Sequence, residues 1–265
     1  MIVPLDFQEE VARAHAARRS GDLRLLAEEA RSFAWGADAV RLIDDAQLQS
    51  AASSGEVQRS AAATPVFARA VLFTGHMLDA PDRPPAVARF PRTLAAETMA
   101  RTMIETALRK ELVDDGGPSL GIAGGACGSD ILFHEVCLSL GVATELFLAL
   151  PTQAFEAESV NRGGPVWIER FRRIVDRVPV RVLMRSKQLP AWLAFKRDYD
   201  IWRRCNLWMM FNALATQATH HTLLALYDRE QKEDGPGGAG HLVHEAAQRG
   251  FKMVELDARK LTTVG

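Results

Sequence analysis

The amino-acid sequence predicts an α/β fold: a doubly wound, mainly parallel, Rossmann-like sheet with helices on both faces and a helical N-terminal appendage. Three observations lead to this prediction. From Ala70 onward, short apolar runs alternate with helical patterns, these runs are apolar on both faces, and residues 1–60 contain no strand pattern. Such strands, joined through helices, are typical of a parallel sheet covered on both sides and connected by right-handed crossovers.

Residues 1–65 are expected to form a helical appendage and a linker. The region is rich in Ala, Glu, Arg and Leu, with helical spacing at Leu23, Leu26, Ala30 and Phe33. Because so thin an apolar face is marginal by itself, we expect two or three helices that pack on the rest of the chain. The small and polar run at 50–65 is typical of a linker.

Residues 66–265 are expected to form the Rossmann-like, nucleotide-binding domain. Its apolar runs predict strands at 70–75, 119–123, 144–150, 178–184, 222–228 and 251–256. Between them, helical patterns begin near 93, 131, 155, 192 and 241. The third helix is expected to span 155–176 and the fourth 192–215. An arginine cluster at 170–181 is interpreted as the solvated face of a helix and its exit.

Two glycine turns follow strands and precede helices. The stretch 119–130, SLGIAGGACGSD, reads as strand, turn and helix, and the stretch 234–240, DGPGGAG, follows a second strand in the same way. Unpaired N–H groups and the helix dipole make such a junction an anion site. Neither turn matches GxGxxG or the P-loop pattern. Together the turns suggest a nucleotide-like ligand held between them, and Gly125→Val or Gly238→Val is expected to abolish binding while leaving the fold intact.

All the glycine turns, including the one at Gly75, follow strands at their carboxyl ends, where ligands bind in doubly wound sheets. Around this edge we expect ligand contacts from Gly75, His76, Asp79, Arg83, Gly124, Gly125, Cys127, Gly128, Ser129, Asp130, Asn206, Asp228, Gly235, Pro236, Gly237, Gly238, Gly240 and His241.

Several of these residues keep two interpretations. Ser129 either caps the helix or donates to a phosphate, and Asp130 either binds ribose hydroxyls or the backbone. Asn206 either reads a base or is satisfied locally. Cys127 either has a thiol pKa lowered by the helix N-terminus or is a small residue in a tight turn, which we favour.

The motifs FTGHMLDAPDR, GIAGGACGSDILFHE and LALYD…DGPGGAG, spread over residues 70–257, resemble the SLOG superfamily. This superfamily is Rossmann-like and is related to the LOG cytokinin-activating enzymes, to DprA and to molybdenum-cofactor carrier proteins. The chain is most similar to SLOG-type domains found beside tetratricopeptide repeats and nucleotide cyclases. The resemblance implies a nucleotide or nucleotide-derived ligand. The LOG enzymes cleave the base from a nucleoside monophosphate and release ribose 5-phosphate.

The chain departs from the LOG motif PGGxGTxxE at its catalytic end. His241 stands at the motif's threonine and His244 at its glutamate, with Glu245 one place late. One residue turns a helical side chain by about 100°, so Glu245 is not expected to face the ligand. The accompanying arginine of the family corresponds to Arg203 or Arg204.

Three functions remain open. The first is a module that binds or senses a nucleotide-like phosphate, and the alternative is a LOG-like phosphoribohydrolase using Glu245, His244 and Arg203. The third is a structural or carrier protein whose glycine turns are only tight turns. Adenine nucleotides, NAD fragments and molybdopterin-like ligands are not distinguished. No other cofactor is indicated, and no metal site is expected, since the two histidines near 241 lack the HExxH order and a third ligand.

Composition bounds the remaining possibilities. The chain has 265 residues, a net charge of −1 and three cysteines without CxxC spacing. Near-zero charge argues against a nucleic-acid partner, and the cysteine pattern favours a reducing compartment. Without an apolar stretch of membrane-spanning length, and with charges early in the N-terminal segment, we expect a cytoplasmic protein with no membrane partner. A homo-oligomer or a partner effector domain is compatible with the sequence.

Overall fold

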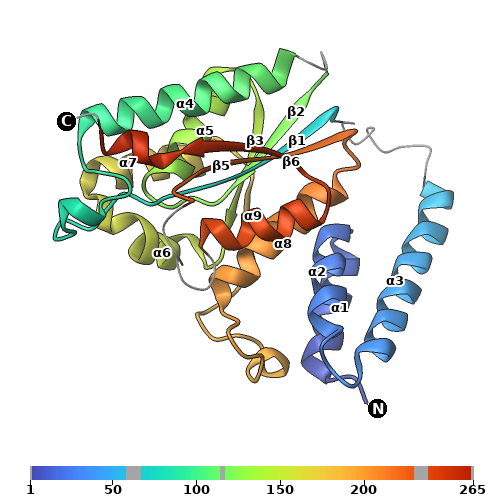
Figure 1. Cartoon of the computed structure of the whole chain (residues 1–265). Helices are drawn as coiled ribbons and strands as arrows, with labels where there is room; N and C mark the ends of the chain where they lie inside the picture. The colour runs from blue at the N-terminus through green and yellow to red at the C-terminus, as the bar shows by residue number, and fades with distance from the viewer. Residues whose placement is uncertain (1, 58–66, 114–116, 230–237, 264–265) are drawn as a thin grey trace.

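The sheet has six parallel strands in the order β4-β3-β2-β1-β5-β6. Figure 1 shows this sheet between its covering helices. The computed structural model describes residues 2–57, 67–113, 117–229 and 238–263. The strands are β1 (Arg69–Gly75), β2 (Ser119–Ala123), β3 (Ala143–Leu148), β4 (Val180–Val182), β5 (His220–Tyr227) and β6 (Lys252–Asp257). The predicted α/β class and the parallel sheet are therefore confirmed. The predicted fourth strand is shorter than expected.

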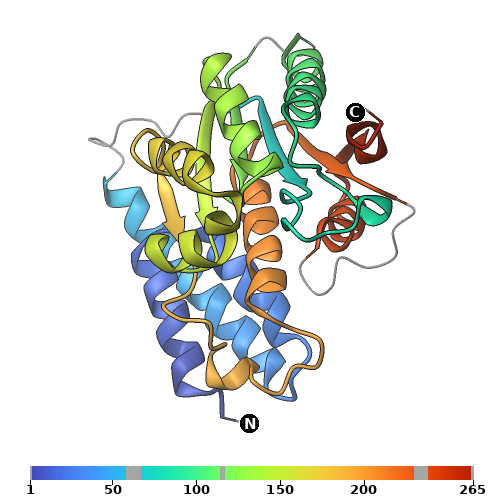
Figure 2. The same ribbon diagram turned by 90° about the vertical axis from the view of Figure 1, so that its left-hand side faces the viewer.

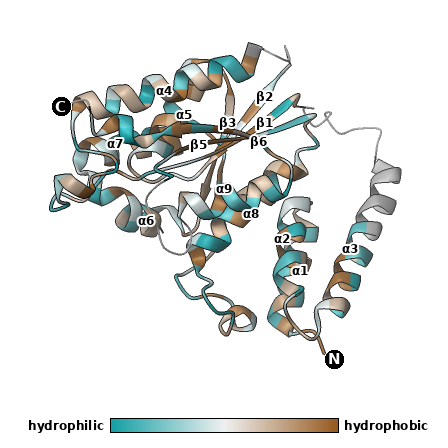
Figure 3. Cartoon of the chain, in the orientation of Figure 1, coloured by the Kyte–Doolittle hydropathy of each residue, from teal (hydrophilic) through white to brown (hydrophobic). Residues whose placement is uncertain are grey.

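Helices cover both faces of the sheet. One face carries α4 (Leu94–Val113), α5 (Ser129–Ser139) and α7 (Pro165–Val175), and the other carries α8 (Ile201–Ala215) and α9 (Ala239–Gln248). Beyond α8 lies a further layer of helices, α1 (Leu5–Ala16), α2 (Ser20–Ala30) and α3 (Gly36–Val57), best seen in Figure 2. The helices carry hydrophobic and hydrophilic residues together (Figure 3), as elements with one packed side must. In the described residues, no helix is long and apolar enough to cross a membrane.

The order of the strands places a topological switch point between β1 and β5. The chain moves outward from β1 to β4 and then returns through α8 to pair β5 with β1, so that Leu72 is in register with Ile122 on one side and Leu223 on the other. Six of the seven residues of β1 are buried. The carboxyl ends of β1 and β5 are therefore where ligands bind in folds of this kind.

Two predicted helices differ from the observed ones. Instead of one helix over 155–176, the chain forms α6 (Thr152–Phe155), a π-helical turn η2 (Glu156–Val160), a 3-10 turn η3 (Asn161–Gly163) and α7. The break occurs at Gly164, whose φ of +87° suits glycine, followed by proline at the first position of α7.

The second difference concerns the predicted helix over 192–215. The helix α8 begins only at Ile201, because the Asp200 carboxylate accepts hydrogen bonds from the N–H groups of Trp202 and Arg203 and so forms its N-cap. Before it stands only a short 3-10 turn, η4 (Ala191–Leu193). Two further 3-10 turns are η1 (Pro85–Val87) and η5 (Ala258–Leu261).

In the arginine cluster at 170–181, Arg172, Arg173 and Arg177 are exposed as expected, but two other arginines are not on a solvated face. Arg170 is buried and bonds Glu97 and Glu135 on two neighbouring helices. Arg181 pairs with Asp22 of α2 at 3.1 Å and lies over the ring of Phe147. The interpretation as a solvated surface is therefore wrong at these two positions, because their carboxylate partners come from distant parts of the chain.

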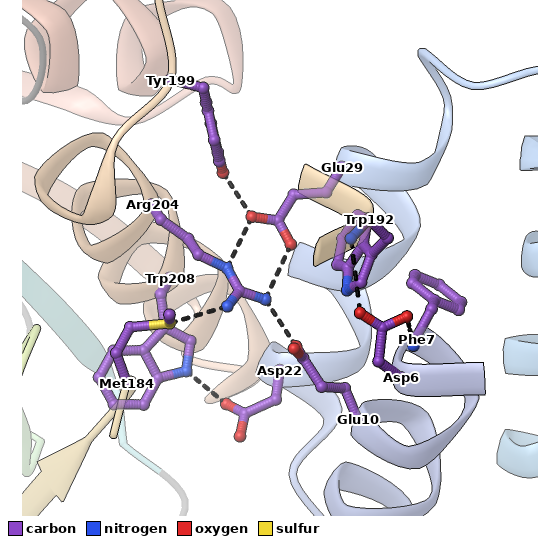
Figure 4. Close-up of polar contacts among 10 residues, drawn as sticks. All are labelled: Asp6, Phe7, Glu10, Asp22, Glu29, Met184, Trp192, Tyr199, Arg204 and Trp208. Atoms are coloured by element: carbon purple, nitrogen blue, oxygen red, sulfur yellow. Dashed lines mark hydrogen bonds and ion pairs between the residues drawn. The ribbon is translucent and has the colours of Figure 1, made fainter. Parts of the chain in front are cut away.

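The N-terminal helices pack on α8, and α3 continues as far as Val57, into the predicted linker. Figure 4 shows the polar centre of this contact. The buried guanidinium of Arg204 bonds Glu29 of α2 and Glu10 of α1, and Tyr199 donates to Glu29 at 2.5 Å. The neighbouring Trp208 indole donates to Asp22 at 2.6 Å. The N-terminal helices thus fix the position of α8, whose residues Trp202, Cys205 and Met209 line a cavity on the side of the helix away from this contact.

Candidate functional site

A cavity of about 420 Å³ lies at the carboxyl ends of β1 and β2. Its lining residues come from the exit of β1, the first glycine turn, β3, α6, the turns η2 and η3, α8 and the start of α9. Of the residues expected to contact a ligand, the cavity is lined by Gly75, His76, Asp79, Arg83, Gly124, Asp130, Asn206 and Gly238. Its place at the β1–β5 switch point is the one expected for a doubly wound sheet.

His76 joins the ends of β1 and β5. Its N–H donates to Leu226 O at 3.0 Å, and its Nε2 accepts from the N–H of Asp228 at 3.0 Å. Burial, with the nearby Arg89, lowers the pKa of His76 to about 4. The imidazole is therefore neutral near pH 7 and serves as an acceptor between two strand ends.

The first glycine turn is occupied by contacts within the protein. The N–H groups of Ala126, Cys127 and Ser129 donate to Asp130 Oδ2 (3.2 Å), Ser159 O (2.9 Å) and His76 O (3.2 Å). The Ser129 hydroxyl also donates to His76 O, at 2.7 Å. These three N–H groups and this hydroxyl therefore already have acceptors, and Ser129 ties α5 to the end of β1.

Glycine is required in this turn by close packing. At Gly128, with φ of +116°, a Cβ would lie 2.6 Å from the Leu78 nitrogen. At Gly125 it would lie 2.9 Å from both Leu146 Cδ1 and Phe171 Cε2, which are core atoms. The expectation that Gly125→Val leaves the fold intact is therefore contradicted, because this glycine faces the core and not the cavity.

The two remaining residues of this turn also act within the protein. Cys127 is fully buried outside the cavity lining, and burial raises the pKa of its thiol to about 11. The Gly124 carbonyl oxygen accepts a hydrogen bond from His134 Nε2 at 2.9 Å. The other ring nitrogen of His134 lies 2.8 Å from Thr144 Oγ1. This buried histidine holds the turn against β3.

Three arginines line the cavity: Arg83 and Arg89 from the segment after β1, and Arg162 from η3. Burial lowers the pKa of Arg89, and the charges of Arg83 and Arg162 lower it further, which places three cations close together. Arg89 and Arg162 were not among the residues predicted from the sequence. The proline-rich segment that suggested Arg83 also contains Arg89, whereas nothing local connects Arg162 with this site.

Asp79 organises the segment that carries the first two arginines. Its Oδ2 accepts from the N–H groups of Arg89 (2.9 Å) and Phe90 (3.0 Å), and its Oδ1 lies 3.4 Å from Arg83 Nε. Arg92 then bonds the Asp79 and Arg162 carbonyls, at 3.2 and 2.9 Å, and so connects this segment to η3. Asp79 and Arg92 hold the arginines in place.

The cavity also has apolar and aromatic lining residues. Phe147 of β3, Phe155 of α6 and the α8 residues Trp202, Cys205 and Met209 line it, together with the amide of Asn206. The rings of Phe155 and Trp202 meet edge to face, with centroids 6.1 Å apart. Burial raises the pKa of the Cys205 thiol to about 12, so this sulfur is neutral. These residues suit a flat, mostly apolar group with a polar edge.

The second glycine turn contributes Gly238 and Ala239 to the cavity. Gly238 is the N-cap of α9, and the cavity therefore lies beside a helix N-terminus. Gly235, Pro236 and Gly237 lie outside the described residues. Gly240 and His241 are not part of the lining, and a Cβ at Gly240 would meet no atom within 4 Å.

The three proposed catalytic residues lie outside the cavity lining. Glu245 bonds Arg249 at 2.6 Å and lies 3.6 Å from His241 Nε2. His244 is exposed and contacts Gln248 at 2.8 Å. Arg203 donates to the Asp198 carbonyl at 3.0 Å. Over the described part of the chain, no group of His, Cys, Asp and Glu side chains is arranged to hold a metal ion.

Comparison of the chain with protein-family models, with curated proteins and with solved structures finds no match. The Rossmann-like fold is shown by the six-stranded parallel sheet itself. The residues that line the cavity therefore indicate which class of ligand it suits.

Proposed function

We propose that this protein binds a nucleotide or a nucleotide-derived phosphate in the cavity at the β1–β5 switch point. The observation that carries the proposal is the set of side chains that share the cavity: three arginines, several aromatic rings and the amide of Asn206. Guanidinium groups pair with phosphate oxygens in fixed, often bidentate geometry. Aromatic rings accept the flat face of a base, and Asn206 carries donors and acceptors suited to its edge.

The size and the place of the cavity support the same class of ligand. A volume of about 420 Å³ falls within the range of sites for small molecules, and doubly wound folds bind nucleotides at this edge. The resemblance of residues 70–257 to the SLOG superfamily implies the same ligand class. Within the Rossmann-like fold, we therefore propose a SLOG-like nucleotide-binding module.

The phosphate is proposed to lie against the arginines and the N-terminus of α9, and not against the first glycine turn. Three N–H groups of that turn already donate to protein oxygens. Arg83, Arg89 and Arg162, by contrast, bring their charges to the cavity, and Gly238 begins a helix beside it. The anion site thus depends on side chains more than on the glycine-rich backbone.

Binding without turnover is the function that we favour over phosphoribohydrolase activity. Glu245, the displaced counterpart of the family's glutamate, is held by Arg249 outside the cavity lining. Without a carboxylate from this helix at the sugar, the acid–base contribution expected of that group, about 10²–10⁴-fold, is absent.

Isothermal titration of the purified protein with AMP and CMP tests the proposal, with mass spectrometry of small molecules released on denaturation as the search for the natural ligand. Arg89→Met and Arg162→Met are expected to weaken AMP binding about 10- to 100-fold each, the usual effect of losing a hydrogen bond to a charged group. Arg109→Met is the matched control, since Arg109 is exposed on α4 and pairs with Glu105. AMP and CMP that give no heat, or equal affinities for all three variants, would refute the proposal.

A further inference from the structure

One carboxyl group in the lining of the cavity has no cationic partner among the described residues. Asp130, the second residue of α5, lines the cavity, and its Oδ2 accepts the N–H of Ala126 at 3.2 Å. Oδ2 also lies 2.8 Å from the position that a Cβ of Gly124 would take, so the glycine turn holds this oxygen closely. Among the described residues, no arginine, lysine or histidine forms an ion pair with Asp130.

The other carboxylates of the cavity are paired. Asp79 has Arg83 at 3.4 Å, and Glu158 has Lys187 at 2.5 Å. A half-buried carboxyl that no described cation neutralises is costly in its ionised form, because the cavity limits its hydration. Burial accordingly raises the pKa of Asp130 to about 7. A charged group that lowers the stability of the fold and lines a cavity is a candidate for ligand contact.

Asp130 shares the cavity with residues of α8 and of η3. Burial raises the pKa of Cys205, on α8, and the charge of Asp130 raises it further. Burial likewise raises the pKa of Cys127, which feels both Asp130 and Arg162. The carboxyl therefore shares one cavity with aromatic residues that suit a base and with arginines that suit a phosphate. In a nucleotide, the sugar joins these two groups.

We propose that Asp130 accepts hydrogen bonds from the hydroxyl groups of the ligand's sugar and so selects ribonucleotides over deoxyribonucleotides. This inference rests on the proposed function, because it needs a nucleotide in the cavity. The carboxylate supplies two acceptor oxygens, one of which keeps its bond to the turn, and a hydroxyl donor partly replaces the water that burial removed.

The proposal predicts the direction of the pH dependence. A hydroxyl donates to the ionised carboxylate, so affinity is complete above pH 7 and falls as Asp130 is protonated. With a pKa of about 7 in the free protein, the ionised fraction changes about tenfold between pH 8 and pH 6. The ligand's phosphate, whose second pKa is about 6, adds about twofold.

The other titratable and charged groups facing the cavity do not mask the pH dependence of affinity. They are His76, Asp79, Arg83 and Arg89 after β1, Glu158 and Arg162 on η2 and η3, and Cys205 on α8. The pKa of His76 is about 4 and that of Cys205 about 12, so both stay neutral between pH 6 and pH 8. The arginines stay charged.

The test is titration of the full chain with AMP, 2′-deoxy-AMP and 3′-deoxy-AMP at pH 8, followed by AMP at pH 6. The wild type is expected to bind AMP at least tenfold more tightly than the weaker of the two deoxy compounds. In Asp130→Asn this preference is expected to disappear, and the loss of AMP affinity at pH 6 is expected to shrink to the twofold effect of the phosphate. Glu105→Gln, on the outer surface of α4, is the control that removes a carboxylate elsewhere.

The outcomes separate the two proposals. No binding of AMP by the wild type refutes the proposed function, and this inference with it. Binding of AMP and both deoxy compounds with equal affinity refutes only the role of Asp130, and this comparison needs no variant. A preference for AMP that survives in Asp130→Asn also refutes it, provided that circular dichroism shows the variant folded.

Discussion

The guanidinium of Arg204 on α8 bonds both carboxylate oxygens of Glu29 on α2, with Nε–Oε1 at 2.9 Å and Nη2–Oε2 at 3.2 Å. Both side chains are almost fully buried, at 2% and 0% exposure. Two buried charges in this geometry connect parts of the chain 175 residues apart. The contact holds the N-terminal helices α1 and α2 against α8 (Figure 4).

Glu29→Ala is expected to destabilise the protein by about 3–5 kcal/mol, because it leaves Arg204 buried with only Glu10 as a carboxylate partner. Urea unfolding at pH 7 measures this change. The double variant Glu29→Leu with Arg204→Met, which removes both charges, is expected to recover most of the loss. A loss below 1 kcal/mol for Glu29→Ala would show that the pair is not essential for docking.

Asp130→Asn is expected to stabilise the ligand-free protein at pH 8. The pKa of Asp130 rises from its ordinary 3.8 to about 7 on folding, so its contribution is complete below pH 3.8 and is lost as pH rises through 7. Asparagine avoids that loss, which has an upper limit of about 4 kcal/mol and is reduced by water in the cavity. Unfolding curves at pH 5 and pH 8 measure it, and a difference between variant and wild type that does not grow with pH would contradict it.

Gly125→Ala and Gly240→Ala are expected to change stability in opposite directions. The new Cβ at Gly125 meets two core side chains at 2.9 Å, which costs about 1–3 kcal/mol of overpacking. At Gly240, in the first turn of α9, the Cβ meets nothing, and alanine gains up to about 1 kcal/mol of helix propensity. Thermal unfolding of both variants decides the matter. Equal shifts would mean that the turn at Gly125 faces open space.

Incubation with AMP or CMP is expected to release no free base and no ribose 5-phosphate. The reason is the ion pair between Glu245 and Arg249, which holds the displaced glutamate away from the cavity lining. Chromatography of the reaction mixture, with AMP binding measured in parallel, provides the check. Turnover near 1 s⁻¹, within the usual range for enzymes and lost in Glu245→Ala, would favour the phosphoribohydrolase.

From the sequence, the location of the candidate site was easier to predict than the groups that line it. Strand ends are local patterns, so the turn after β1 and the two glycine turns pointed to an edge of the sheet, and residues of all three line the cavity there. The first glycine turn was expected to offer its N–H groups to a phosphate, but Ser159 O and His76 O, from distant segments, accept two of them. Arg162 enters the cavity from η3 for the same reason, as a residue brought in by packing.

The sequence by itself determined the class of fold, because the alternation of apolar runs and helical patterns after Ala70 is set by local periodicity and needs no partner. It also predicted a helical N-terminal region, which α1, α2 and α3 confirm as far as Val57. Only the tertiary structure decided which charges are buried and paired: Arg204 with Glu29, Arg170 with Glu135, and Glu245 with Arg249. Except within one helix, such pairs join residues far apart in the chain, and their energies depend on burial, which a sequence does not specify.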